Sequence, residues 1–250
     1  PFLIILVIGL LIGIFLIKDF PEQCGAYRDN DKSLTPEIAN AMMVAEIENK
    51  KSSVWTIWNT IKSKEFWFGT IAVGALLSCA IGLMSQSMQI VNAGVGEEKY
   101  SAVMATVMIF GCIGSYVIGL IDTKIGTKKA MIISCALMVI AGVLGLLGNG
   151  IVLWIAMIFV AMFMGASSNY TVSGSVQYWR IEDFPTVFGK VNPLANLMNN
   201  MAPMVIAGLM FMNAAQTHGQ PQAAPAFAFV GIAGVISIIL LLLFKPARVK

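Results

Sequence analysis

Long uninterrupted runs of apolar residues constrain this chain more than any other feature. The runs cover residues 2–17, 66–90, 100–121, 130–148, 151–175, 186–212 and 226–244. A helix of about 20 apolar residues crosses the ~30 Å hydrocarbon core of a bilayer. Because lipid offers no partners to backbone N–H and C=O groups, each run is expected to form an α-helix.

Composition excludes a soluble domain. Of the 250 residues, 58% are hydrophobic and 12% are charged, whereas about a quarter of the residues are charged in ordinary soluble domains. The ten-residue alternating pattern of a membrane β-barrel is absent. The net charge of +3 is small and scattered near the expected helix ends, so nucleic acid is not an expected partner. We expect an all-α integral membrane protein in contact with the lipid bilayer.

The sequence contains no recognisable catalytic, metal-binding or cofactor motif. Its one histidine, His218, lies in an expected loop, and no Walker, H-E-x-x-H or G-x-S-x-G pattern occurs. The cysteines follow no pairing or metal-ligand spacing: Cys79, Cys112 and Cys135 lie inside apolar runs and Cys24 lies in a loop. We expect neither an enzyme nor a cofactor-binding protein, and four unpaired cysteines.

The distribution of Lys and Arg predicts the orientation in the membrane. Most basic residues occur in the loop 18–65, in the turn near 122–129 and at the C-terminus, whereas the loops 91–99 and 213–225 contain few. Basic loops face the cytoplasm. We therefore expect a multi-pass protein of the cell membrane with loop 18–65 and the C-terminus in the cytoplasm.

The same pattern predicts the domain organisation. Residues 1–17 are expected to be the end of a transmembrane helix, because this run is short and the chain opens inside it without an initiator Met. We therefore interpret the chain as a fragment. Residues 18–65 form a cytoplasmic central loop, 66–245 a bundle of six transmembrane helices, and 246–250 a cytoplasmic tail.

Two short helices are expected within loop 18–65. Thr35-Pro36-Glu37 is typical of a helix N-terminus, with an N-cap, a first-turn proline and a first-turn acid. Val54, Trp58 and Ile61 follow at spacings of four and three, which indicates an amphipathic helix at the membrane interface. A solvated linker with incidental aromatic residues is the alternative.

A stripe of amides marks the run 186–212. Asn192, Asn196 and Asn199 share one helical face, and Asn200 lies beside it. An amide facing lipid would be unsatisfied, so this face is expected to meet protein or water. Helix-to-helix hydrogen bonds and a translocation pathway are both compatible with the stripe. Pro193 and Pro203, each of which removes a backbone donor, are expected to loosen this helix.

Two further runs carry weaker polar faces. In 66–90 the face contains Ser78, Gly82, Ser85 and Gln89, with Gln86 adjacent; in 151–175 it contains Ser167, Tyr170, Thr171 and Gly174, with Asn169 nearby. Tight packing through small residues is the alternative to a pathway. Packing alone is expected for Gly111, Ser115 and Gly119, and for Gly142, Gly145 and Gly148.

Charged residues are absent from the centres of the runs. Lys190 comes nearest, about one turn inside the cytoplasmic end of the run 186–212. Such a lysine can extend its ammonium group back to water. Contact with an anionic substrate is the second interpretation.

The turn after the run 100–121 carries a recognisable motif. Gly119, Ile121, Lys124, Gly126 and Lys128 follow one another in the order of the signature loop G-x-L-a-D-[RK]-x-G-[RK]-[RK], with Lys129 next to Lys128. Thr123 occupies the acidic position, and Asp122 stands one residue before it. In this loop the chain resembles the major facilitator superfamily, and Phe188-Gly189 followed by Asn192 resembles its oxalate/formate antiporter group.

The resemblance implies a fold and a function. It implies the six-helix C-terminal bundle of a twelve-helix secondary transporter, together with the end of the preceding helix and a cytoplasmic linker. Implied partners are an N-terminal half that this sequence lacks and a small solute, with a small organic anion and a coupling ion as candidates. The residues 119–129 would act as a gate. A membrane sensor or assembly subunit without transport activity is the alternative.

Overall fold

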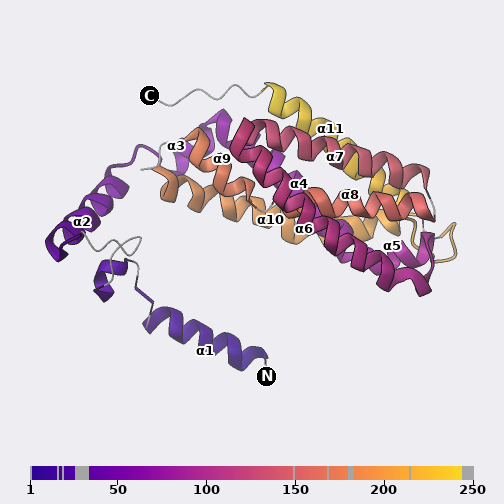
Figure 1. Ribbon diagram of the computed structural model, residues 1–250, viewed down its shortest axis with the longest axis horizontal. Coiled ribbons are helices and arrows are strands. Elements are labelled where there is room, and N and C mark those ends of the chain that lie inside the picture. The colour runs from indigo at the N-terminus through magenta and orange to yellow at the C-terminus, as the bar shows by residue number, and fades with distance from the viewer. Residues whose placement is uncertain are drawn as a thin grey trace. The chain divides into compact units, whose positions relative to one another are not determined.

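The computed structural model describes residues 2–15, 17–18, 20–25, 34–148, 150–167, 169–179, 183–213 and 215–243. Its regular elements are all helices in this part of the chain, as the sequence predicts (Figure 1). The chain divides into two compact units, Pro1–Val54 and Trp55–Lys250.

The described residues of the first unit contain three helical elements. They are α1 (Phe2–Phe15), the 3-10 helix η1 (Pro21–Cys24) and α2 (Pro36–Ser52). The hydroxyl of Thr35 accepts a hydrogen bond from the backbone N–H of Ile38 at 3.4 Å, and Pro36 occupies the first turn. This confirms the predicted helix start, because an N-cap oxygen satisfies a backbone donor that the first turn leaves free.

The second unit holds the bundle. Its elements are α3 (Ile57–Lys62), α4 (Lys64–Ser85), α5 (Ser87–Gly94), η3 (Glu97–Lys99), α6 (Tyr100–Ile125), α7 (Thr127–Leu147), α8 (Ile151–Ser167), α9 (Tyr170–Tyr178), α10 (Phe184–Met210) and α11 (Ala223–Leu243). The predicted tail 246–250 lies outside the described residues.

Three of the described helices are long and apolar enough to cross a membrane, namely Glu97–Ile125, Thr127–Leu147 and Ala223–Leu243. Two bent pairs raise this number to five if each pair is one span. The 14 residues of α1 and the polar helix α10 do not meet the same test. The chain is thus a multi-pass membrane protein, and the sevenfold crossing stays a prediction.

Two of the expected spans are broken helices. The run 66–90 divides at Gln86 into α4 and α5, whose axes differ by 61°. The run 151–175 divides before Tyr170 into α8 and α9, with a bend of 41°. The expectation that Ser78, Gly82, Ser85 and Gln89 share one continuous helical face is therefore wrong for Gln89, which follows the break.

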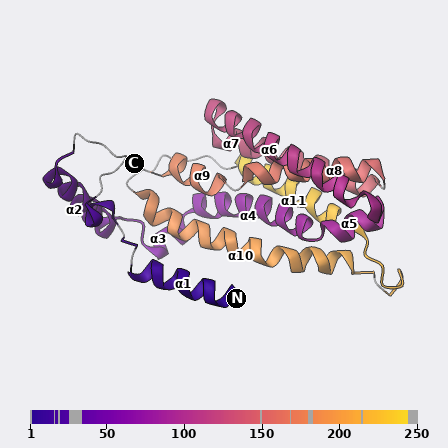
Figure 2. The same cartoon turned by 60° about the horizontal axis from the view of Figure 1, so that its bottom comes forward.

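The proline-containing helix does not break. Pro193 and Pro203 both lie inside α10, which is a single helix over 27 residues. The prolines were expected to loosen this helix, but they do not divide it into two. A neighbouring helix can stabilise a backbone carbonyl that proline leaves free, and α10 runs alongside α4 (Figure 2).

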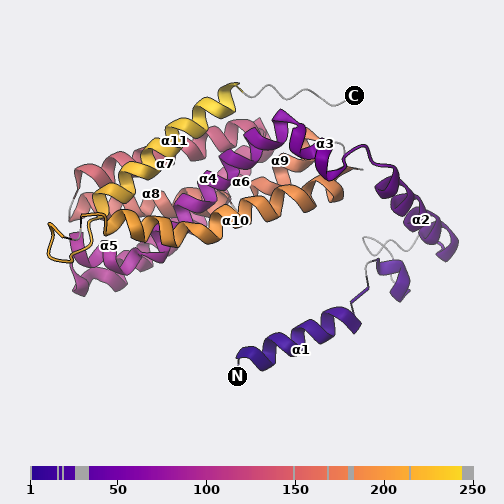
Figure 3. The same cartoon turned by 180° about the vertical axis from the view of Figure 1, so that it is seen from behind.

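The helices form two groups of three, α4/α5–α6–α7 and α8/α9–α10–α11, which pack across one another. The first helix of each group packs against the second helix of the other, α4 on α10 and α8 on α6, and the third helices α7 and α11 pack together (Figure 3).

Glycines set the close approaches between these pairs. A Cβ added to Gly142 in α7 would lie 2.5 Å from the Cα of Gly231 in α11, and one added to Gly114 in α6 would lie 2.5 Å from the Cα of Met162 in α8. Small residues allow transmembrane helices this proximity. The predicted packing role of Gly142 is confirmed, whereas Gly119 is exposed with no atom within 4 Å of an added Cβ, so packing alone is wrong for it.

Candidate functional site at the α6–α9 pocket

The predicted gating loop is almost entirely helical. α6 continues through Asp122 and Lys124 to Ile125, and α7 begins at Thr127, so Gly126 alone makes the turn. Gly126 has φ of +90°, a conformation that side chains other than glycine adopt rarely. The glycine of the motif is thus required by the backbone, and the expected loop is a tight corner between two helices.

The C-terminal part of α6 forms one wall of a pocket, and α9 with the residue before it forms the other. We call it the α6–α9 pocket; it has a volume of about 330 Å³. It is lined by Ser115, Ile118, Gly119, Asp122, Thr123, Asn169, Tyr170, Val172 and Ser173. The pocket therefore brings two predicted gating residues, Gly119 and Asp122, together with two predicted pathway residues, Asn169 and Tyr170.

The break between α8 and α9 explains why the pocket lies there. Before the break, α8 packs tightly on α6: a Cβ on Gly165 would lie 2.5 Å from the carbonyl oxygen of Gly111 and 3.0 Å from the Cβ of Ser115. After the break, the chain turns away from the axis of α8. Ser115 thus lies where close packing ends and the pocket begins.

Tyr170 anchors one wall of the pocket. Its side chain is 2% exposed, and its hydroxyl is hydrogen-bonded to the hydroxyl of Ser134 in α7 at 2.7 Å. The phenol group therefore joins α9 to α7. Asn169, one residue earlier, is exposed, and its backbone carbonyl accepts from the N–H groups of Val172 and Ser173 at 3.1 and 2.9 Å.

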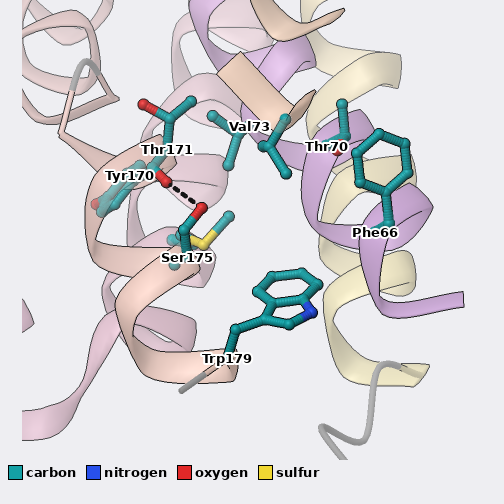
Figure 4. A pocket seen from close by; sticks show the side chains of 10 residues that line it. Phe66, Thr70, Val73, Tyr170, Thr171, Ser175 and Trp179 are labelled. Atoms are coloured by element: carbon teal, nitrogen blue, oxygen red, sulfur yellow. Dashed lines mark hydrogen bonds between the residues drawn. The ribbon is translucent and has the colours of Figure 1, made fainter. Parts of the chain in front are cut away.

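A second cavity, bordered by residues of α4 and α9, is much smaller (Figure 4). Its volume is about 20 Å³, enough for roughly one water molecule. Phe66 and Trp179 border it, the hydroxyl of Ser175 donates to the carbonyl of Thr171 at 2.7 Å, and the hydroxyl of Thr70 is buried without a partner among the described residues. A solute would not fit into this cavity.

The asparagine stripe of α10 lies away from the α6–α9 pocket lining. Asn196 donates a hydrogen bond to the side-chain oxygen of Asn192 at 3.1 Å, one turn apart on the same helix. The side-chain oxygen of Asn199 is buried and accepts no hydrogen bond from the described residues, while Asn200 is exposed. The stripe is therefore partly satisfied within α10 and partly open to a further partner.

The predicted residues of 66–90 have different surroundings. Gln86 at the break donates to the carbonyl of Pro203 in α10 at 3.5 Å. Ser85 is exposed and donates to the carbonyl of Gly82 in its own helix at 2.7 Å, and Gln89 is exposed on α5. Gly82 packs on α10, since an added Cβ would lie 3.1 Å from the carbonyl oxygen of Ala202.

Lys190 is engaged by the segment that precedes the bundle. Its ammonium group donates to the carbonyl of Trp55 and, at 3.4 Å, to the hydroxyl of Thr60. The side chain thus extends towards α3 and bonds protein groups there, so its predicted extension to water stays a prediction. Contact with an anionic substrate would require Lys190 to add to or exchange these partners.

Residues of the pocket that the sequence did not assign to a site are Ser115, Ile118, Val172 and Ser173, and Thr123 was included only as part of the gating segment 119–129. Ser115, Gly119 and Asp122 stand at i, i+4 and i+7 and share one face of α6. This stripe was a usable signal in the sequence, but Ser115 and Gly119 alone indicate only packing.

The described residues contain no group of three or more His, Cys, Asp or Glu side chains placed to bind a metal. The four cysteines are free thiols, with Cys79 and Cys135 buried and Cys24 and Cys112 exposed.

Comparison with known proteins gives one match. No curated protein and no solved structure matches the chain. The model of the Major Facilitator Superfamily matches residues 1–207, which include α1 to α9 and most of α10. Members of this family are membrane transporters of small molecules. On this match and on its apolar helical bundle, the chain belongs to the major facilitator superfamily.

Proposed function

We propose that the bundle Trp55–Leu243 is the C-terminal half of a secondary active transporter that moves a small polar solute by alternating access. The observation that carries the proposal is the α6–α9 pocket, which joins the family's signature segment to a broken helix. Broken helices whose backbone lines a cavity are a recurrent site of transport.

The lining of the pocket favours a polar solute. Asp122 contributes an acidic group, and Asn169, Ser115, Ser173 and Thr123 contribute neutral donors and acceptors. No basic side chain is among the described lining residues. A small organic anion of the oxalate type would therefore need its countercharge from an N-terminal half.

The corner at Gly126 is well placed to act as part of a gate. Lys128 and Lys129 lie in the first turn of α7, where the positive end of the helix dipole already favours an anion. Carboxylates of an N-terminal half are the partners that this charge arrangement suits. Pairing and release of such contacts would close and open the cytoplasmic end.

Cysteine accessibility tests the pocket directly. Ser173→Cys and, as a matched control on the same helix, Ser175→Cys are made in the full-length protein with Cys24 and Cys112 replaced by Ser. Ser175 is 2% exposed and does not line the α6–α9 pocket. Labelling by a water-soluble maleimide is expected in the Ser173→Cys variant and should change when transport is driven. Labelling of the Ser175→Cys variant should stay low.

Solute counterflow in proteoliposomes is the test of transport itself. Protein that folds and inserts but supports no counterflow of any offered solute would count against the proposal, as would equal labelling of the two cysteine variants. For the α10 stripe, Asn199→Leu with Asn200→Leu is the informative variant. Unchanged transport would remove both asparagines from the translocation path.

A further inference from the structure

A second, more apolar recess lies at the end of the bundle where α3, α4 and α10 begin. We call it the α3–α10 groove; its volume is about 470 Å³, within the usual range of ligand pockets. Ile57 and Ile61 of α3, Trp67 of α4, and Gly189, Lys190 and Leu197 of α10 are among its lining residues.

The lining suits a hydrocarbon chain. Ile57, Trp67 and Leu197 are 62%, 42% and 56% exposed, so large apolar side chains border the groove and remain uncovered by the bundle. The predicted apolar stripe of Val54, Trp58 and Ile61 differs from this arrangement: α3 starts only at Ile57, and Trp58 is 71% exposed. It is Ile57 and Ile61, one turn apart, that border the groove.

One charged group lies beside this apolar surface. Lys190 is the charged side chain among the described lining residues. Its ammonium group has three N–H donors, of which two point to the carbonyl of Trp55 and the hydroxyl of Thr60. The described residues offer no third acceptor, so one donor remains for an anionic oxygen at the rim of the groove.

The surroundings are those of a membrane interface. The indole N–H of Trp67 donates to the carbonyl of Ile61 at 2.6 Å, which holds the ring against α3. Lys62 ends α3 and Lys64 begins α4, within a few residues of Trp67 in the chain. Trp and Lys at helix ends are typical of the boundary between hydrocarbon and headgroups, and the cytoplasmic leaflet carries anionic lipid.

We propose that the α3–α10 groove binds an anionic phospholipid, with an acyl chain along Ile57, Trp67 and Leu197 and the phosphate at Lys190. A phosphate accepts a charge-assisted hydrogen bond from an ammonium group. The acyl chain would cover the apolar side chains that the bundle leaves exposed. This site is separate from the α6–α9 pocket and does not depend on the transport proposal.

Gly189 gives a sharp way to fill the groove. An added Cβ at Gly189 meets no atom within 4 Å, and the same holds for Gly208, another exposed glycine of α10 that does not line the groove. Gly189→Phe is therefore expected to occlude the groove without disturbing the helix, and Gly208→Phe is its matched control.

The measurement is quenching of tryptophan fluorescence by brominated lipid in full-length protein reconstituted into phosphatidylcholine vesicles. Brominated phosphatidylglycerol is expected to quench the wild type and Gly208→Phe more strongly than brominated phosphatidylcholine does, and Gly189→Phe is expected to lose this preference. Lys190→Gln is expected to lower the preference for phosphatidylglycerol about fivefold, since one lysine near a membrane surface contributes about that factor.

Equal quenching of the wild type by the two lipids would overturn the proposal. So would an unchanged lipid preference in Lys190→Gln, which keeps the test decisive if Gly189→Phe fails to fold. Soluble glycerol phosphate serves as a competitor for the headgroup alone. Displacement of the brominated lipid by this competitor would point to a free phosphate site instead of a lipid site.

Discussion

The two groups of three helices both begin with a broken helix, but the surroundings of the two breaks differ. Each break separates a long helix from a short one, and the short helices α5 and α9 lie at opposite ends of the bundle (Figure 1). At the α5 end, the backbone N–H of Gly150 donates to the carbonyl of Gly94 at 2.5 Å, and Gln86 bonds Pro203. At the α9 end, the break borders a pocket of about 330 Å³.

We interpret this difference as a division of roles, with closure at the α5 end and access at the α9 end. A break whose polar groups are bonded to neighbouring helices holds the bundle together. At the α9 break, Tyr170 is bonded to Ser134 of α7, whereas Asn169 and Ser173 border the pocket, where a solute could reach them. We expect the α5 end to act as a fixed contact and the α9 end as the responsive one.

Both groups depend on the glycine crossing between α7 and α11, where the largest effect is expected. Gly142→Ala places a Cβ 2.5 Å from a backbone atom of Gly231, whereas Gly231→Ala places one 3.5 Å from Gly142, an ordinary contact. We expect Gly142→Ala to destabilise the bundle by about 3 kcal/mol and Gly231→Ala by less than about 0.5 kcal/mol. Thermal unfolding in detergent measures both, and equal melting temperatures would contradict this packing.

Substitution of Asp122 tests whether the α9 end of the bundle takes part in transport. Asp122→Asn removes the charge of the α6–α9 pocket while keeping the size of the side chain. We expect transport to slow about tenfold, comparable to the loss of one charge-assisted hydrogen bond. The control is Glu98→Gln, an exposed acid in η3 next to α5. Initial rates of uptake should separate the two variants, and a larger effect at Glu98 would reverse the assignment of the two ends.

Substitution of Gln86 tests whether its hydrogen bond to α10 stabilises the break between α4 and α5. Gln86→Leu removes the hydrogen bond to Pro203 and should loosen α5 by about 0.5–1 kcal/mol. Ser85→Ala is the control, because among the described residues the Ser85 hydroxyl donates to the carbonyl of Gly82 in its own helix. Hydrogen exchange of residues 87–94 should quicken in the first variant and stay unchanged in the second. If both behave like the wild type, the bond does not hold the break.

The smallest effect is expected on α10. Asn196→Ala removes a side-chain hydrogen bond to Asn192 one turn away, a kind of pair that contributes about 0.2–0.5 kcal/mol. The melting temperature should therefore change little. A clear loss of uptake with an unchanged melting temperature would instead place Asn196 on the translocation path and extend the site from the pocket to α10.

The elements that depend on local physics could be predicted from the amino-acid sequence. Apolar runs near 20 residues can satisfy their backbone in lipid only as helices, so membrane residence and the all-α class follow from them. The N-cap at Thr35 and the close crossing at Gly142 also follow from residue type. The motif contains a glycine at position 126 because the backbone there has a positive φ.

Where helices break and which residues meet depend instead on packing in three dimensions. The breaks occur at Gln86 and just before Tyr170, while the helix with Pro193 and Pro203 continues, because packing against a neighbour can override a local preference. The α6–α9 pocket depends on a bend after Gly165 that brings α9 past Asp122, and such proximity between residues about 50 positions apart is invisible in helical periodicity. Local spacing fixes the face of a helix, but a site forms where the faces of two helices separate.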